Sequence, residues 1–194
     1  MTDYYYDYNW RRIGAVIAVA VAIGVVVWLL FIRGDDDGSD TGPPGQIVTS
    51  DVQPIGPAPA SGEDLKAAAA ELGHPLYWAG RHEDGDVELT VTADGRAFVR
   101  YLTDGAEAGD ENANFLTVGT YQVENAEAAL TEVAGREGRE SFEVPGGGLA
   151  VADAAEPTRV YFTPADSDLQ IEVFDPEAGR ARELVASGDI QPIG

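Results

Sequence analysis

A run of twenty residues without charge or proline constrains this chain more than any other feature. It reads IGAVIAVAVAIGVVVWLLFI and extends from 13 to 32. As a helix it would be about 30 Å long, which matches the hydrocarbon core of a bilayer. A cleavable signal peptide is the alternative, because Ala18-Val19-Ala20 has the small-x-small pattern of a cleavage site. In a signal peptide the apolar segment precedes the cleavage site, whereas here most of the apolar run follows the pattern. The spacing therefore favours an uncleaved transmembrane helix.

The charges around this run predict its orientation. Arg11 and Arg12 stand directly before it, whereas Arg33 is followed at once by an acidic segment, GDDDGSD. Positive residues concentrate on the cytoplasmic side of membrane helices, so the N-terminus is predicted to be cytoplasmic. The opposite orientation is the alternative, because only two arginines are set against one. The predicted organisation is a cytoplasmic tail (1–12), a transmembrane helix (13–32), an acidic Gly/Pro-rich linker (33–61) and an extracytoplasmic domain (62–194).

Small residues recur every four positions in the transmembrane run, at Gly14, Ala18 and Ala22. Such a stripe lets a second helix approach closely, so weak self-association through it is a further expectation.

Composition excludes several classes of function. The formal net charge is −22, from 34 acidic and 12 basic side chains. Binding to nucleic acid requires neutralising negative charge, so we expect no nucleic-acid partner. The chain has no cysteine, which excludes disulfides, thiol nucleophiles and thiolate metal sites. No glycine-rich nucleotide loop or nucleophile-elbow motif occurs, so we expect neither a cofactor nor a catalytic residue.

Residues 62 to 194 predict an α+β fold. Caps and apolar spacing predict helices at 62–73, 125–135 and 176–187, the last with Asp175 as its N-cap. Short apolar runs predict strands at 76–79, 87–93, 96–102, 115–123, 141–144, 149–152, 159–163 and 168–174. The order is α-ββββ-α-ββββ-α, with antiparallel sheet or sheets and about three helices packed on one face.

One hairpin can be predicted in register. A three-residue loop ending at Gly95, in the left-handed conformation, pairs Leu89 with Val99 and Glu88 with Arg100. A two-residue loop would instead place Arg100 in the apolar row, because a one-residue slip exchanges the faces. The sheet is therefore expected to have one apolar face and one mostly polar face.

On that polar face, Arg96, Phe98 and Arg100 form a basic and aromatic strip. Such a strip can bind a carboxylate, a phosphate or a sugar, which makes these residues candidate ligand-binding residues. The alternative is purely structural, namely a Glu88–Arg100 cross-strand pair with an exposed ring.

Other motifs predict little chemistry. His74 and His82 lack the spacing of a helical zinc pair. Asp110, Asn112 and Asn114 resemble the start of a calcium loop, but Phe115 stands where that loop needs glycine. The sequence therefore predicts no metal site, and the glycine run at 145–150 is most simply a turn.

The hexapeptide DVQPIG at 51–56 returns as DIQPIG at 189–194. Proline cannot donate to a β-ladder, so both copies are predicted to be edge strands or extended straps. We expect the two copies to lie side by side and bring the ends of the domain together.

Residues 63–194 resemble a group of uncharacterised actinobacterial membrane proteins with one N-terminal span and a C-terminal extracytoplasmic domain. The resemblance rests on GHPLYWAG, DGRAFVRYL, FLTVGTYQV, GGGLAVADAAEPTRVYF and QIEVFDPEAGRARELVASG. It implies a topology and brings no known activity. The expected function is a membrane-anchored extracytoplasmic module that binds an envelope protein or glycan. The alternative is a hydrolase acting on the cell wall through carboxylates.

Overall fold

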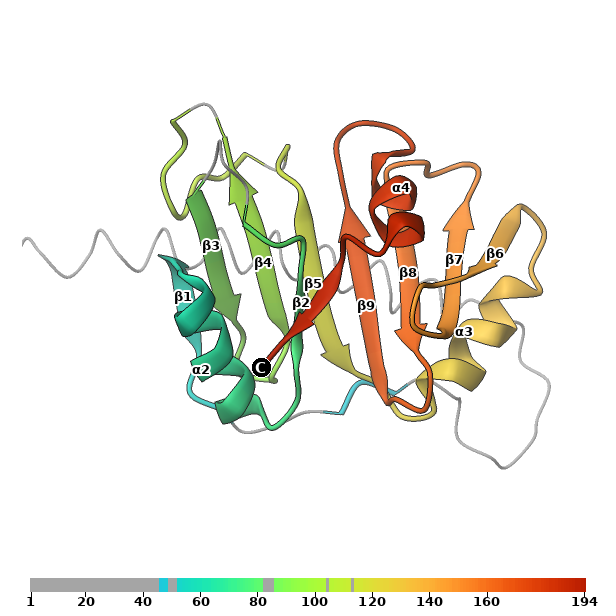
Figure 1. The fold of residues 1–194 in the computed structure, drawn as a ribbon, viewed down its shortest axis with the longest axis horizontal. Helices are drawn as coiled ribbons and strands as arrows, with labels where there is room; N and C mark the ends of the chain where they lie inside the picture. Colours follow the sequence, from blue (N-terminus) through green and yellow to red (C-terminus); the bar gives the residue numbers. More distant parts are fainter. Residues whose placement is uncertain (1–45, 49–51, 82–85, 104, 113) are drawn as a thin grey trace, which may run out of the picture.

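The computed structural model describes residues 46–48, 52–81, 86–103, 105–112 and 114–194. Eight strands form one antiparallel sheet in the order β1-β3-β4-β5-β9-β8-β7-β6 (Figure 1). The strands of this sheet are β1 (Ile55–Pro59), β3 (Asp86–Val91), β4 (Ala97–Leu102), β5 (Thr117–Gln122), β6 (Arg139–Glu143), β7 (Gly148–Asp153), β8 (Arg159–Pro164) and β9 (Leu169–Phe174). A two-stranded sheet pairs β2 (Leu76–Trp78) with β10 (Gln191–Ile193). The helices are α2 (Gly62–Leu72), α3 (Ala126–Ala134) and α4 (Arg180–Ser187). This confirms an antiparallel α+β domain.

The predicted hairpin is present in the predicted register. Leu89 lies opposite Val99, and Glu88 lies opposite Arg100. The amide of Thr92 donates to the carbonyl of Arg96 at 2.9 Å, which closes a three-residue loop. Gly95 has a φ of 82° in this loop, a conformation that favours glycine.

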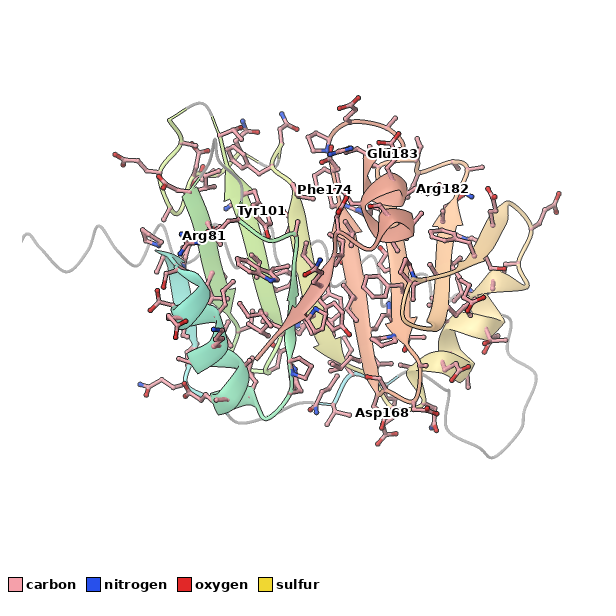
Figure 2. The ribbon with its side chains drawn as sticks, viewed as in Figure 1. Arg81, Tyr101, Asp168, Phe174, Arg182 and Glu183 are labelled. Atoms are coloured by element: carbon pink, nitrogen blue, oxygen red, sulfur yellow. The ribbon has the colours of Figure 1, made fainter. Side chains whose placement is uncertain are left out.

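One face of the large sheet, which we call the inner face, carries the main core. Its alternate residues include Leu89, Val99 and Ile171, all buried. The helices α2 and α4 and the small β2–β10 sheet lie over this face (Figure 1). The hydroxyl of Tyr101 on β4 accepts a hydrogen bond from the amide of Ala79 at 2.5 Å (Figure 2). The inner face therefore holds most of the apolar surface that the domain buries.

The expectation that all three helices cover one face is wrong for α3. Leu130 and Val133 of α3 pack against Val151 and Tyr161. The neighbouring positions on the same strands, such as Phe162, belong to the core beneath α4. Successive residues of a strand point to opposite faces, so α3 lies on the other side of the sheet. Apolar residues on both faces of β7 and β8 account for this arrangement.

The helix starts agree with the prediction only in part: Asn125 is the N-cap of α3 as expected, whereas the third helix starts later than predicted. Ser61 caps α2 through a capping box with Asp64. Asn125 does precede α3, but its side chain makes no capping bond. The third helix begins at Arg180 rather than at 176, and Gly179 is its N-cap. Asp175 instead accepts a hydrogen bond from the amide of Glu177 in a local turn, which delays the helix.

The two copies of the hexapeptide do not pair with each other. In the first copy Ile55 begins β1 and lies opposite Val91 of β3. In the second copy Gln191 and Pro192 lie opposite Trp78 and Tyr77 of β2. Each copy therefore has a different partner, and the predicted pairing is wrong. Their assignment to edge positions is correct, because β1 ends the large sheet and β10 has one neighbour.

Both edges of the large sheet carry residues that disfavour further pairing. The edge strand β1 contains Pro57 and Pro59, and a bulge interrupts its register between Ile55 and Ala58. The opposite edge strand, β6, reads RESFE. Proline and charge are both common means of protecting an exposed sheet edge.

The run 13–32, the small-residue stripe within it and most of the linker lie outside the described residues. Within the described ranges, no helix is long and apolar enough to cross a bilayer. The transmembrane segment therefore stays a prediction.

Candidate functional site

The second face of the sheet, opposite the inner face, gathers charged and aromatic side chains. We call it the polar face. It follows from alternation: Leu169, Ile171 and Val173 point to the core, so Gln170 and Glu172 point the other way. The cross-strand pairs place the following residues on it: Glu88, Thr90, Arg96, Phe98, Arg100, Tyr121, Arg159, Tyr161, Gln170 and Glu172.

Arg100 is held at one end of the polar face. Its Nη1 lies 2.8 Å from Oε1 of Glu88, and its Nη2 donates to the carbonyls of Asp110 and Asn112. The guanidinium also lies over the ring of Phe115, at 5.1 Å from the centroid. These contacts, together with the burial of Arg100 and Glu88, make the pair a brace between the strands and the loop before β5.

The other two residues of the predicted strip lie further along the same face. Arg96 forms an ion pair with Asp94 at 2.7 Å. Phe98 is buried and packs edge-on against Tyr121, with ring centroids 5.8 Å apart. The structural alternative is therefore correct for the Glu88–Arg100 pair, but the expected exposed ring is buried. Ligand binding by Arg96, Phe98 and Arg100 stays a prediction.

Glu172 is the centre of a second cluster on the polar face. Its Oε2 accepts a hydrogen bond from the hydroxyl of Tyr121 at 2.5 Å, and its Oε1 accepts one from Tyr161 at 3.3 Å. Nε of Arg159 lies 3.6 Å from the same Oε1. Arg159 also stacks over Phe174 at the end of β9, with 5.6 Å between the guanidinium carbon and the ring centroid (Figure 2).

Burial controls the protonation of this second cluster. Desolvation raises the pKa of the Glu172 carboxyl to about 7, although Tyr121, Arg159 and Tyr161 act to lower it. Burial also raises the pKa values of Tyr121 and Tyr161 well above their ordinary value, and the charge of Glu172 adds to this. Both tyrosines therefore stay protonated as donors, while Glu172 changes charge near neutral pH.

Several polar atoms on the polar face are buried without a hydrogen-bond partner, although Nε of Arg159 lies in the ion pair with Glu172. Within the described part of the chain, Oγ1 of Thr90, both amide atoms of Gln170, and Nε of Arg96 and of Arg159 lack hydrogen bonds. Among the described residues, every other buried side-chain nitrogen or oxygen atom has a hydrogen-bond partner. Gln170 is 1% exposed and Thr90 is 3% exposed. We call these five atoms, which have no hydrogen-bond partner, the orphaned atoms. All of them belong to the polar face.

These orphaned atoms are energetically costly. A buried donor or acceptor without a partner costs roughly 1–3 kcal/mol, so native proteins contain few of them. A concentration on one face is the arrangement expected where hydrogen bonds are completed by another molecule. Chemically, the polar face can donate and accept hydrogen bonds, and it carries one carboxyl that titrates near neutral pH.

The loop that resembled a calcium site has a structural role. Oδ1 of Asp110 accepts a hydrogen bond from the backbone amide of Asn112, and the side-chain Oδ1 of Asn112 accepts one from the backbone amide of Asn114. Among the described residues, no group of three or more His, Asp or Glu side chains is arranged to hold a metal. His74 contacts the carbonyl of Pro75, and His82 lies outside the described residues.

The glycine run is a tight turn before β7. A Cβ on Gly148 would lie 2.2 Å from the carbonyl oxygen of Thr163, so only glycine lets β7 and β8 approach there. The turn also borders a cavity of about 220 Å³ beside Tyr77 and Pro192. Another hollow, more open and about 590 Å³ in volume, lies between the start of α3 and the turn at Asp168.

One half of the polar face, with Arg96, Phe98 and Arg100, is predictable from local sequence, whereas the cluster around Glu172 is not. The alternation of Leu169, Ile171 and Val173 with Gln170 and Glu172 is enough only to place Glu172 on the polar side. Its contacts with Tyr121 and Tyr161 depend on the pairing of β5 with β9 and of β9 with β8, which no local pattern reveals. A buried acid between two tyrosines could therefore not be found from spacing.

No protein-family model, curated protein or solved structure matches this chain.

Proposed function

We propose that this chain is a membrane-anchored binding module that uses the polar face to contact a partner or ligand. The run 13–32 anchors it, the N-terminus is cytoplasmic, and the domain lies outside. The observation that carries the binding role is the set of orphaned polar atoms on Thr90, Arg96, Arg159 and Gln170. A partner that completes these hydrogen bonds recovers part of the cost of burying them.

The spacing of the buried acids supports binding over hydrolysis. Glu88 on β3 and Glu172 on β9 are separated by β4 and β5. At about 4.8 Å per strand, their backbones lie about 14 Å apart across the strands, and Glu172 is offset by a further two residues along β9. Glycoside hydrolysis by two carboxylates requires a separation of about 5 to 9.5 Å. Glu88 is also engaged by Arg100 and by the amide of Gly109, so it is poorly placed to act as a base.

A hydrolase remains the second candidate because of Glu172. A carboxyl whose pKa is about 7 is suited to general acid–base chemistry. Arg159 links Glu172 to a second acid, Glu156. Its Nε lies 3.6 Å from Oε1 of Glu172, and its Nη1 lies 3.8 Å from Oε2 of Glu156. If this candidate is correct, Glu172→Gln abolishes hydrolysis of purified cell-wall material while the protein stays folded.

The topology can be tested because the natural chain has no cysteine. Single cysteines are introduced in the full chain at Glu143, which is exposed on β6, and at Thr2 in the N-terminal tail. A membrane-impermeant maleimide applied to intact cells is expected to label Glu143→Cys and not Thr2→Cys. The reverse pattern contradicts the proposed orientation, and labelling of both only after lysis contradicts an external domain.

The binding role is tested with two matched variants. Gln170→Met removes the orphaned amide from the polar face, whereas Gln122→Met changes the same residue type on the opposite side of the neighbouring strand. The full chain in lipid nanodiscs is mixed with sedimented cell-envelope material. We expect saturable binding that Gln170→Met weakens and Gln122→Met leaves unchanged. Equal binding by both variants contradicts the role of the polar face.

A further inference from the structure

We infer that the ligand of the polar face is a neutral, hydroxyl-rich oligosaccharide. This inference rests on the proposed binding function and specifies its ligand. Three observations support it: the orphaned atoms include both donors and acceptors, they lie on or next to central strands of the sheet, and the chain is strongly acidic.

The orphaned atoms need a ligand that both donates and accepts. Nε of Arg96, Nε of Arg159 and Nε2 of Gln170 are donors, whereas Oε1 of Gln170 is an acceptor. The hydroxyl of Thr90 can do either. An anion can only accept, so it would leave Oε1 of Gln170 unsatisfied. An ammonium cation can only donate, and a metal ion neither donates nor accepts a hydrogen bond, so either would leave the three donor nitrogens unsatisfied. A sugar hydroxyl donates and accepts, and can therefore satisfy every one of them.

The charge of the chain excludes the anionic alternatives independently. The net charge is −22, and Glu172 lies among the orphaned atoms. Nucleic acids and anionic polymers would be repelled, because their affinity depends on neutralising phosphate or carboxylate charge. Arg96 and Arg159 do not offset this, because each is already paired with an acid. A neutral ligand meets no such barrier.

The position of the orphaned atoms distinguishes a glycan from a peptide. Extended peptides usually bind a sheet by adding a strand at its edge, where backbone groups are free. Gln170 lies on β9, which has β5 on one side and β8 on the other. Its backbone is therefore paired, and only its side chain is available. Recognition by side chains on the face of a sheet is how some antiparallel folds bind oligosaccharides.

The extent of the orphaned atoms fits a chain of several sugars rather than one. Thr90 lies on β3 and Arg159 on β8, four strand spacings apart. At about 4.8 Å per spacing this is about 19 Å. The rings of Phe98, Tyr121 and Tyr161 belong to the same face between these ends.

Binding must include an opening step. Gln170 and Thr90 are 1% and 3% exposed, so the ligand reaches them only when the face opens. Association that requires a conformational change is slower than the usual 10⁵–10⁷ M⁻¹s⁻¹. We therefore expect slow association and increased amide exchange at the margins of the polar face before the ligand is bound.

The test measures binding of defined probes to the full chain in lipid nanodiscs, without sugar-headed detergents. The probes are a panel of neutral tetrasaccharides (chito-, cello-, malto- and mannotetraose), with tetraalanine as the peptide probe. We expect at least one tetrasaccharide to bind and tetraalanine not to bind. Gln170→Met loses two hydrogen bonds, so it should weaken that binding at least tenfold. Thr90→Val should weaken it less, and Gln122→Met should leave it unchanged.

A stability measurement makes the same variants informative without any ligand. Replacing an unsatisfied buried amide by an apolar side chain of similar shape removes its desolvation cost. The melting temperature of Gln170→Met is therefore expected to rise by a few degrees, whereas that of Gln122→Met should stay constant. Higher stability together with lost binding indicates that Gln170 serves binding. Removing a residue that only packs in the core would instead lower both the stability and the binding.

The outcomes separate the two proposals. If tetraalanine binds and depends on Gln170 while no tetrasaccharide binds, the glycan inference is overturned and the binding face stands. If neither probe binds, yet envelope material still binds through Gln170, the glycan inference again fails alone. If Gln170→Met matches Gln122→Met in stability and in all binding, both proposals are overturned.

Discussion

The hydroxyl of Tyr121 lies across the backbone of Gly119 and donates a hydrogen bond to the carboxyl of Glu172. A Cβ built on Gly119 would lie 2.5 Å from that hydroxyl oxygen, which shows how closely the ring crosses the strand. The hydrogen bond itself measures 2.5 Å. Because Gly119 has no side chain, the side chain of Tyr121 can cross β5 and donate its hydrogen bond to Glu172 on β9.

Gly119→Ala is expected to destabilise the domain through Tyr121. The added methyl forces the ring to move, and overpacking of this kind typically costs about 1–3 kcal/mol. In a Tyr121→Ala background the same substitution should cost much less, because the obstructing ring is gone. Urea unfolding of the four proteins in the double-mutant cycle measures this coupling. Equal costs in both backgrounds would contradict the close approach.

Glu172 is expected to make stability depend on pH. Its folded pKa of about 7 lies above the ordinary value of 4.5. A raised carboxyl pKa stabilises the fold fully below about pH 4.5, and this contribution is lost as the pH rises through 7. The difference between the two pKa values corresponds to about 3 kcal/mol.

The variant Glu172→Gln isolates this contribution from the many other acids. Relative to the variant, the natural protein should lose about 3 kcal/mol of unfolding free energy between pH 4 and pH 8. Glu143→Gln on the exposed edge strand is the control and should follow the natural protein. Urea unfolding at several pH values provides the comparison, and parallel curves for Glu172→Gln and the natural protein would contradict the raised pKa.

Breaking the Glu88–Arg100 pair from one side should be severe. Arg100→Met leaves the carboxylate of Glu88 buried without its charge partner, which typically costs about 3–5 kcal/mol. Replacing both residues by Met should cost less than the single change, because no uncompensated charge remains. Denaturant unfolding of the single and double variants tests this. A double variant less stable than Arg100→Met would contradict the brace described above.

The hairpin loop provides a local prediction. Gly95 has a φ of 82°, so Gly95→Ala should cost about 1–2 kcal/mol. Gly95→Asn should cost less, since asparagine adopts this conformation more readily than alanine. Thermal unfolding ranks the three proteins. If alanine and asparagine are equally destabilising, the cost arises from something other than the backbone conformation.

Local patterns were sufficient for the hairpin and for most elements. The register of β3 and β4 follows from apolar alternation and one turn glycine, both contained within the single segment Asp86–Leu102. The end of α2 at Gly73 and the end of α4 at Gly188 likewise follow from left-handed glycines. Physical rules that act over a few residues were therefore reliable here.

Long-range relationships were not accessible in the same way. The two hexapeptides are similar in sequence, but β1 pairs with β3 and β10 pairs with β2, because pairing depends on the neighbours each end meets. The strands β7 and β8 have apolar residues on both faces, so α3 and α4 pack on opposite sides of the sheet. The amphipathic pattern of a helix does not indicate which face of the sheet that helix packs against.

The candidate site was predicted in its position and not in its character. Alternation placed Phe98 and Arg100 on a polar face, as the structure shows. A polar face is ordinarily expected to be solvated, whereas Glu88, Gln170 and Glu172 are almost completely buried. Such burial involves contacts between segments distant in sequence, such as Arg100 with the loop before β5 and Glu172 with Tyr121. None of these can be inferred from the residues of one strand.

The proline-bearing strand β1 and the charged strand β6 close the two ends of the large sheet. If the chain is tethered to a lipid surface as proposed, neighbouring copies collide often, because they are confined to two dimensions. Unprotected borders would then join domain to domain into fibres. Terminating each border chemically would then allow such a tethered protein to accumulate at high surface density while its copies remain separate.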